Sequence, residues 1–170
     1  MIRNFEDFCC ELQDCGFSMG GGNAKGIFAL IDYDWTNQDQ LDTPVKWHCG
    51  DPEVDPWEWR AVIARRGEVA YGKFFDGKAG FISREWLPYF ANYRRDGYDY
   101  DARYDDGLMK NREKIVMDAV EKNGPMLSSE LKKYCGFGKD GLKGFDGVLT
   151  SLQMQTYLMV REFVYKKDKQ

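Results

Sequence analysis

Histidine and paired cysteines are scarce in this sequence. It contains one histidine, His48, and five cysteines that form no C-x-x-C pair. A zinc site or a Ser-His-Asp triad would therefore rest on His48 alone, which excludes the common forms of both. The odd number of cysteines and the adjacent pair Cys9 and Cys10 argue against a disulfide framework. We expect reduced thiols, no metal site and no bound cofactor.

Long apolar runs are also absent. No stretch approaches the roughly 18 uninterrupted apolar residues that a membrane span needs. The N-terminus "MIRNFEDFCCELQDC" lacks the apolar core and the small-residue cleavage site of a secretory signal. We therefore expect a folded cytoplasmic protein without a membrane partner.

Two motifs typical of ligand sites are incomplete. The glycine-rich "SMGGGNAKG" precedes the predicted strand "IFALI", whereas a phosphate-binding loop follows a strand and usually carries G-K-[ST]. We interpret it as a turn. An acidic run could bind a divalent metal, but helix capping and solvated loop carboxylates explain it better; it consists of Asp51, Glu53, Asp55 and Glu58.

Charge divides the chain into two parts. Residues 1–107 carry 12 Lys and Arg against 20 Asp and Glu, whereas residues 108–170 carry 12 against 8. The first part is therefore acidic and the second basic, which is compatible with nucleic-acid binding by the second. We predict a domain boundary in the connector "GYDYDARYDDG", with an aromatic-rich domain over 1–107 and a second domain over 108–170.

Local signals predict an α+β fold for the first domain. A helix is expected from Asn4 to Cys15, and a second one after Asp55 and Pro56, ending at Gly67. The strands of "EVAYGKFFDGKAGFIS" flank Asp76-Gly77, a dipeptide that favours a tight turn, so we predict a small antiparallel hairpin. A further helix, "REWLPYFANYRR", follows it.

Aromatic side chains concentrate in this first domain. At helix and strand spacing they usually face inward, so we expect them to form its core. A stacking platform for unpaired bases, with arginines around it, is the alternative. The aromatic residues are Trp57, Trp59, Tyr71, Phe74, Phe75, Phe81, Trp86, Tyr89, Phe90 and Tyr93, and the arginines are Arg60, Arg65, Arg66, Arg94 and Arg95.

The second domain has the pattern of a winged helix-turn-helix. Helices are predicted at about 111–122, from Ser128 to Gly136 and at about 139–154, with a tight turn between the last two and a strand in "TYLMVREFVY". Such a domain would place its third helix in the major groove of duplex DNA. The predicted DNA-binding residues are the polar and cationic ones on that helix and beyond it: Lys139, Lys143, Thr150, Ser151, Arg161, Lys166 and Lys167.

Four segments carry a resemblance to a known family: "GDPEVDPWEWR", "EVAYGKFF", "AGFISREWLPYFANYRRDGYDYDARYDDG" and "LQMQTYLMVREF". Together they resemble the bacterial AlkZ-related proteins, which are distantly similar to AlkZ-type DNA glycosylases assembled from winged-helix units. The resemblance implies a chain that continues past Gln170. It also implies a Gln-x-Gln or Gln-x-Asp pair that orients water for hydrolysis of the sugar-base bond.

Two strings match that pair, Gln38-Asp39-Gln40 in a polar loop and Gln153-Met154-Gln155 at the joint between a helix and a strand. Strand alternation predicts that Gln153 and Gln155 point to the same side. The sequence therefore leaves three functions open. These are a non-catalytic DNA-binding protein, a glycosylase acting on alkylated bases through this glutamine pair, and a protein-protein interaction module, with which a homodimer is compatible.

Overall fold

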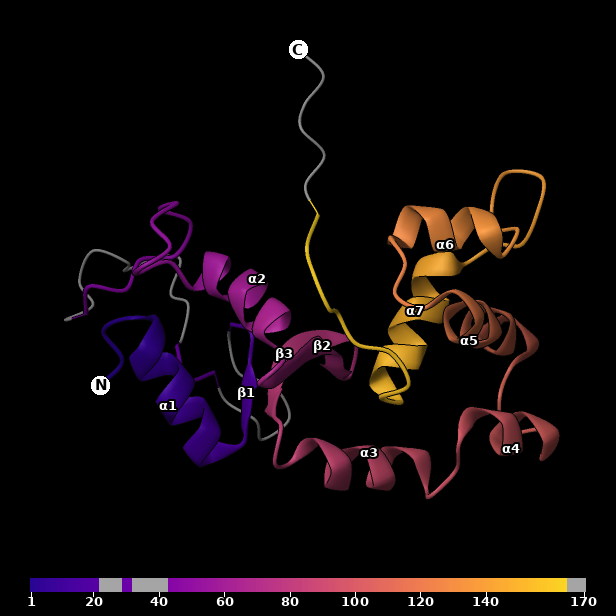
Figure 1. Cartoon of the computed structure of the whole chain (residues 1–170), viewed down its shortest axis with the longest axis horizontal. Coiled ribbons are helices and arrows are strands. Elements are labelled where there is room, and N and C mark those ends of the chain that lie inside the picture. The colour runs from indigo at the N-terminus through magenta and orange to yellow at the C-terminus, as the bar shows by residue number, and fades with distance from the viewer. Residues whose placement is uncertain (22–28, 32–42, 165–170) are drawn as a thin grey trace, which may run out of the picture.

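The computed structural model describes residues 1–21, 29–31 and 43–164, and it confirms the α+β fold (Figure 1). In chain order the elements are α1 (Phe5–Cys15), β1 (Phe17–Met19), α2 (Pro56–Arg66), β2 (Val69–Phe75), β3 (Lys78–Ser83), α3 (Leu87–Arg95), α4 (Tyr100–Asp105), α5 (Asn111–Asn123), α6 (Ser128–Tyr134) and α7 (Phe145–Met154).

Helices α1 and α2 begin and end at the residues that their sequences indicate. The side chain of Asn4 accepts a hydrogen bond from the backbone N–H of Asp7 at 2.9 Å, and Gly16, with φ of 81°, ends α1. Asp55 caps α2 in the same way, Pro56 is its first residue, and Gly67 ends it in the left-handed conformation. Both predictions are confirmed because the caps act locally.

The sheet has the strand order β1-β3-β2, and both pairings are antiparallel. The predicted hairpin is confirmed: Asp76 and Gly77 have φ of 55° and 77°, as a tight turn with two left-handed residues requires. Strand β1 was not predicted, because three residues are too few for a periodic pattern. The strand predicted in "IFALI" is described only at residues 29–31, which belong to no strand.

The aromatic residues of the first part divide between core and surface. Trp59 and Phe74 are fully buried and Phe81 nearly so, as expected for core residues. In contrast, Tyr89 and Tyr93 on α3 remain 70% and 78% exposed, because α3 buries none of its residues. The prediction of an aromatic core was therefore wrong for Tyr89 and Tyr93, and also for Trp57 and Trp86, which are 40% and 46% exposed. Phe90 on α3 is partly buried and packs against Phe75 of the core, as predicted.

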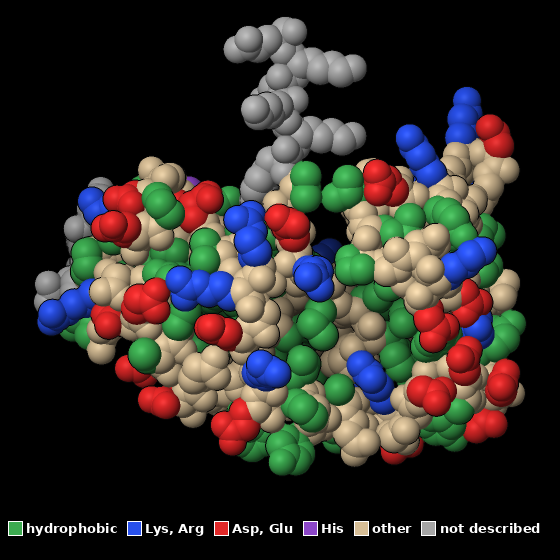
Figure 2. Space-filling view, viewed as in Figure 1, with side chains coloured by type: hydrophobic (Ala, Val, Ile, Leu, Met, Phe, Trp, Pro, Cys, Tyr) green, Lys and Arg blue, Asp and Glu red, His purple; other side chains and the backbone are tan. Residues whose placement is uncertain are grey.

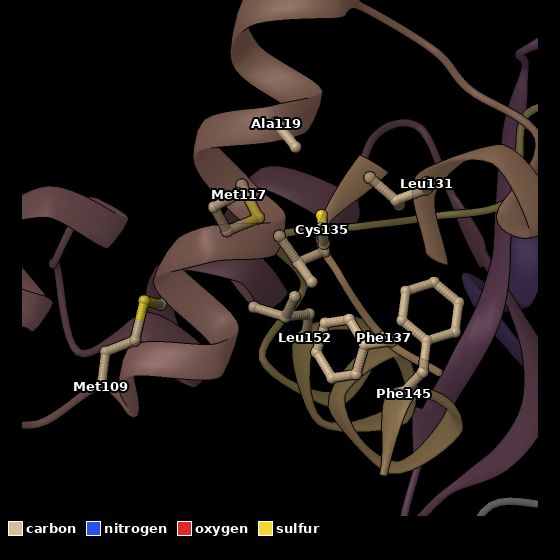
Figure 3. Close-up of a cluster of buried hydrophobic side chains, with 9 residues drawn as sticks. Met109, Met117, Ala119, Leu131, Cys135, Phe137, Phe145 and Leu152 are labelled. Carbon is tan, nitrogen blue, oxygen red and sulfur yellow. The ribbon is translucent and has the colours of Figure 1, made fainter. Parts of the chain in front are cut away.

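Helices α5, α6 and α7 enclose a separate core, shown in Figure 3, and they follow in the predicted order. Helix α7 begins at Phe145 instead of residue 139, because Gly144 takes φ of 81°, outside the helical region. The predicted tight turn is a loop over residues 135–144. At Gly141 an added Cβ would lie 2.1 Å from the Gly136 carbonyl oxygen, so this loop requires glycine there.

Two further expectations need correction. The connector, for which no helix was predicted, contains the short helix α4, whose Asp99 cap accepts from the backbone N–H of Ala102 at 2.8 Å. The strand predicted from residue 156 onward is reduced, within the described range up to residue 164, to one antiparallel bridge between Tyr71 and Val160. A wing is therefore not formed by the described residues, and the domain boundary at residue 107 stays a prediction.

Candidate nucleic-acid interface

The C-terminal half of α7 packs against strand β2 (Figure 1). The side-chain oxygen of Gln153 accepts a hydrogen bond from the backbone N–H of Lys73 at 2.8 Å. The Lys73 ammonium lies 3.5 Å from the hydroxyl oxygen of Thr150, and the Thr150 methyl would contact a Cβ added at Gly77. The helix face that was expected to be outward is therefore directed at the hairpin.

Gln153 also helps to protect an exposed strand edge. Strand β2 is at the edge of the sheet, so its outer backbone groups need partners other than a neighbouring strand. Tyr71 and Lys73 direct backbone groups to this edge; the Tyr71 carbonyl accepts from the N–H of Val160 at 2.9 Å, and the Lys73 N–H donates to Gln153. Together the glutamine and the extended segment cover the edge.

Gln155 belongs to a different hydrogen-bond network. Its amide nitrogen donates to the carboxylate of Glu113 at 3.1 Å and to the hydroxyl of Ser151 at 3.1 Å. Ser151 donates to the same carboxylate at 2.5 Å, and the backbone N–H of Lys110 donates to its other oxygen at 3.0 Å. Glu113 is only 4% exposed, so these donors satisfy a buried charge at the start of α5.

The two glutamines therefore do not face one side. Residues two apart in a helix are separated by about 200° around its axis, and the joint is helical through Met154, with Gln155 still in the right-handed helical conformation. The expectation of strand geometry at this joint was wrong. Each amide stabilises a different contact of α7, one with β2 and the other with α5.

The chain turns sharply directly after this joint. Thr156 has φ of 66° and is 1% exposed, an unfavourable backbone conformation for a β-branched residue. The Arg95 guanidinium from α3 donates to the Thr156 carbonyl at 2.5 Å and to its hydroxyl at 3.2 Å. It also lies 4.7 Å from the ring centre of Tyr157. The turn is therefore held by a side chain from the first part of the molecule.

The opposite end of α7 is open. No side chain caps its first turn, and a Cβ added at Gly147 would meet nothing within 4 Å. Exposed lysines lie on α6 and on the loop that leads into α7, and we call these four residues the lysine tip: Lys132, Lys133, Lys139 and Lys143. Figure 2 shows cationic side chains projecting from this corner of the molecule, at the upper right.

Backbone contacts hold Lys143 and the loop part of the lysine tip in place. The ammonium of Lys143 donates to the carbonyl of Gly138 at 2.7 Å and also to that of Lys139. Arg112 on α5, an exposed cation that sequence periodicity did not single out, donates to the carbonyl of Lys143 at 2.9 Å. Of the other predicted contacts, Arg161 is exposed, whereas Lys166 and Lys167 are outside the described residues.

The remaining candidates have other environments. Asp55 is fully buried by its capping role, and His48 packs with its ring 4.7 Å from that of Trp57. Within residues 1–21, 29–31 and 43–164, no cluster of three or more His, Cys, Asp or Glu could hold a metal ion. The string Gln38-Asp39-Gln40 is outside the described residues.

Comparison with known proteins agrees with the sequence resemblance. Residues 2–170 match the family described as AlkZ related. The chain belongs to the AlkZ-related family. Neither a curated protein nor a solved structure matches this AlkZ-related chain. Across the part that the structure describes, no helix has the length and apolar character needed to cross a membrane.

Proposed function

We propose that this AlkZ-related protein binds duplex DNA through the lysine tip and the open N-terminal turn of α7. The observation that carries the proposal is the asymmetry of α7, whose first turn is open beside exposed lysines while its last turns are hydrogen-bonded to β2 and α5. In helix-turn-helix proteins the N-terminal residues of the recognition helix reach the base edges. The open end of α7 is the end that such docking uses.

The four lysines favour contact with phosphates over reading of bases, although the first turn itself also carries the exposed carboxylate of Asp146. Helix α7 carries no arginine, the residue that most often recognises guanine. Lysine ammonium groups bind the backbone as point charges and carry no sequence information. We therefore expect binding of low sequence selectivity with a strong dependence on salt concentration.

The test is anisotropy of a labelled duplex at several salt concentrations. The double variant Lys133→Glu/Lys139→Glu should weaken binding about tenfold or more and reduce the salt slope by about 2, one for each lost phosphate contact. The control Lys46→Glu/Arg84→Glu makes the same change of charge at two exposed residues of the N-terminal part. Absent duplex binding, or equal loss in both double variants, would overturn the proposal.

In this proposal Gln153 and Gln155 have a structural role and not a catalytic one, because both amides are hydrogen-bonded to protein groups. Incubation with alkylated duplex DNA tests this assignment directly. Release of base by the wild-type protein that disappears in a folded Gln153→Ala/Gln155→Ala variant would replace it with glycosylase chemistry. Circular dichroism of the double variant shows whether it is folded.

A further inference from the structure

A cavity of about 370 Å³ lies in the first part of the molecule, away from the lysine tip. Aromatic rings and two cations line it, contributed by the loop before α2, by α2 itself and by strands β2 and β3. The residues that matter for its chemistry are Trp47, Trp57, Tyr71, Phe81, Arg60 and Lys78. Its volume is within the range of small-molecule sites, roughly 300–1,000 Å³.

Buried Asp55 holds the two tryptophans of this cavity together. Its carboxylate accepts backbone N–H groups of His48 at 3.0 Å, Gly50 at 2.9 Å and Trp57 at 2.8 Å. The loop that carries Trp47 is thereby tied to the first turn of α2, which carries Trp57. The aromatic wall is therefore set by backbone hydrogen bonds before any ligand binds.

Arg60 provides positive charge beside this wall. Its guanidinium carbon lies 3.2 Å from the ring centre of Trp57 and 4.8 Å from that of Phe163 in the C-terminal segment. Stacking on both rings keeps the guanidinium close to the cavity. Lys78, which is exposed on β3 directly after the hairpin turn, adds a second cation, and the described lining residues include no carboxylate.

This combination has a specific ligand chemistry. Aromatic walls bind flat rings by stacking, which each nucleobase permits, and a guanidinium and an ammonium bind phosphate. We propose that the cavity binds a nucleotide unit, with its base among the rings of Trp57 and Tyr71 and its phosphate toward Arg60 and Lys78. Such a unit is either a free nucleotide or an unpaired nucleotide of a strand.

Calorimetric titration distinguishes these sources. The four deoxynucleoside monophosphates, a single-stranded oligonucleotide, a duplex with one bulged nucleotide and an intact duplex are titrated separately. Binding of monophosphates would show that a free nucleotide is a sufficient ligand for the cavity. Binding of the single strand and the bulged duplex, but not of monophosphates, would show that the ligand is an unpaired nucleotide within a strand. If no monophosphate binds, and neither the single strand nor the bulged duplex binds more tightly than the intact duplex, the proposal is wrong.

Matched variants locate the binding. Trp57→Ala and Lys78→Ala should each weaken it about tenfold, whereas Trp57→Phe, which keeps a stacking ring, should retain most of it. Trp86→Ala and Arg84→Ala remove an exposed tryptophan and an exposed cation outside the cavity lining and should have no effect. Equal losses in Trp57→Ala and Trp86→Ala would overturn the assignment to the cavity.

The lysine tip serves as a separate control. Lys133→Glu/Lys139→Glu should leave binding of a monophosphate unchanged while weakening the intact duplex. If the protein binds the duplex but no nucleotide unit, only the proposal for the cavity is refuted. A protein that binds nucleotides but not the duplex refutes only the function proposed above.

Discussion

The two parts of this protein differ in charge and in the residues that form their cores. Residues 1–107 are acidic and pack aromatic rings around a sheet, whereas the basic part that follows packs methionine, aliphatic and phenylalanine side chains between helices (Figure 3). Nevertheless, they are closely joined. A sharp change in amino-acid composition along a chain therefore does not imply that the two parts pack separately.

Hydrogen bonds between polar groups form much of the contact between the two parts. The groups come from both parts and lie on β2, on α3 and the loop after it, and on α7 and the extended segment after it. The pairs are Gln153 with Lys73, Val160 with Tyr71, Arg95 with Thr156, and Tyr157 with Tyr98. Each of these polar groups could equally have been hydrogen-bonded to water at the surface. The sequence alone therefore did not indicate which protein group each one contacts.

The largest expected effect tests whether the two parts unfold together. Leu152→Ala removes a fully buried side chain of the helical core and should lower the free energy of unfolding by about 2–5 kcal/mol. Urea unfolding is followed by tryptophan fluorescence and by circular dichroism. The fluorescence reports only on the first part, because the tryptophans are Trp35, Trp47, Trp57, Trp59 and Trp86.

Since α7 is hydrogen-bonded to β2, both signals should shift by the same denaturant concentration. Leu108→Ala, at a leucine that is 56% exposed, is the control and should change stability little. A shift in circular dichroism with unchanged fluorescence would instead establish two independent domains.

A somewhat smaller effect is expected from the arginine that crosses the junction. Arg95→Ala leaves the buried Thr156 carbonyl without its charged donor and removes the contact with the Tyr157 ring, so it should cost about 2–3 kcal/mol. Arg95→Lys keeps the charge but loses the two-donor geometry, and should recover only part of this. Stability of Arg95→Ala equal to wild type would show that the turn at Thr156 needs no such support.

The two glutamines should differ in their contribution. Gln155→Ala removes a donor from the buried carboxylate of Glu113 and should cost about 1–3 kcal/mol. Gln153→Ala should cost less, about 1 kcal/mol, because water can reach the Lys73 N–H that it leaves. Thermal unfolding measures both, with the exposed Gln13→Ala as control; a larger loss for Gln153→Ala would reverse our view of the joint.

The smallest effect concerns one thiol of the first part. Burial, assisted by the nearby Glu6 carboxylate, raises the pKa of Cys9 from 9.0 to about 11. The folded protein therefore keeps this proton longer than the unfolded chain, so the stability that Cys9 contributes is present below pH 9 and is lost as the pH rises toward 11. Cys9→Ala should flatten that decline relative to wild type in denaturant unfolding, whereas Cys10→Ala, at an exposed cysteine, should leave it unchanged.

Elements with local signals could be predicted from the sequence. The Asn4 and Asp55 caps, the glycines that end α1 and α2, and the Asp76-Gly77 turn each act within a few residues. Where the outcome depended on distant partners, prediction failed. The exposed rings of α3 and the reduced strand after α7 are two examples, because neither burial nor strand pairing is encoded within the segment itself.

For the candidate site, the sequence alone determined which residues are present: the lysines around α7, the glutamine pair and the aromatic residues near α2. It also determined most helix ends, since caps and turns are short-range. Only the tertiary structure decided which end of α7 is covered and which is open. Hydrogen bonding between α7, β2 and α5 depends on groups 38 to 80 residues apart, whose proximity no local pattern specifies.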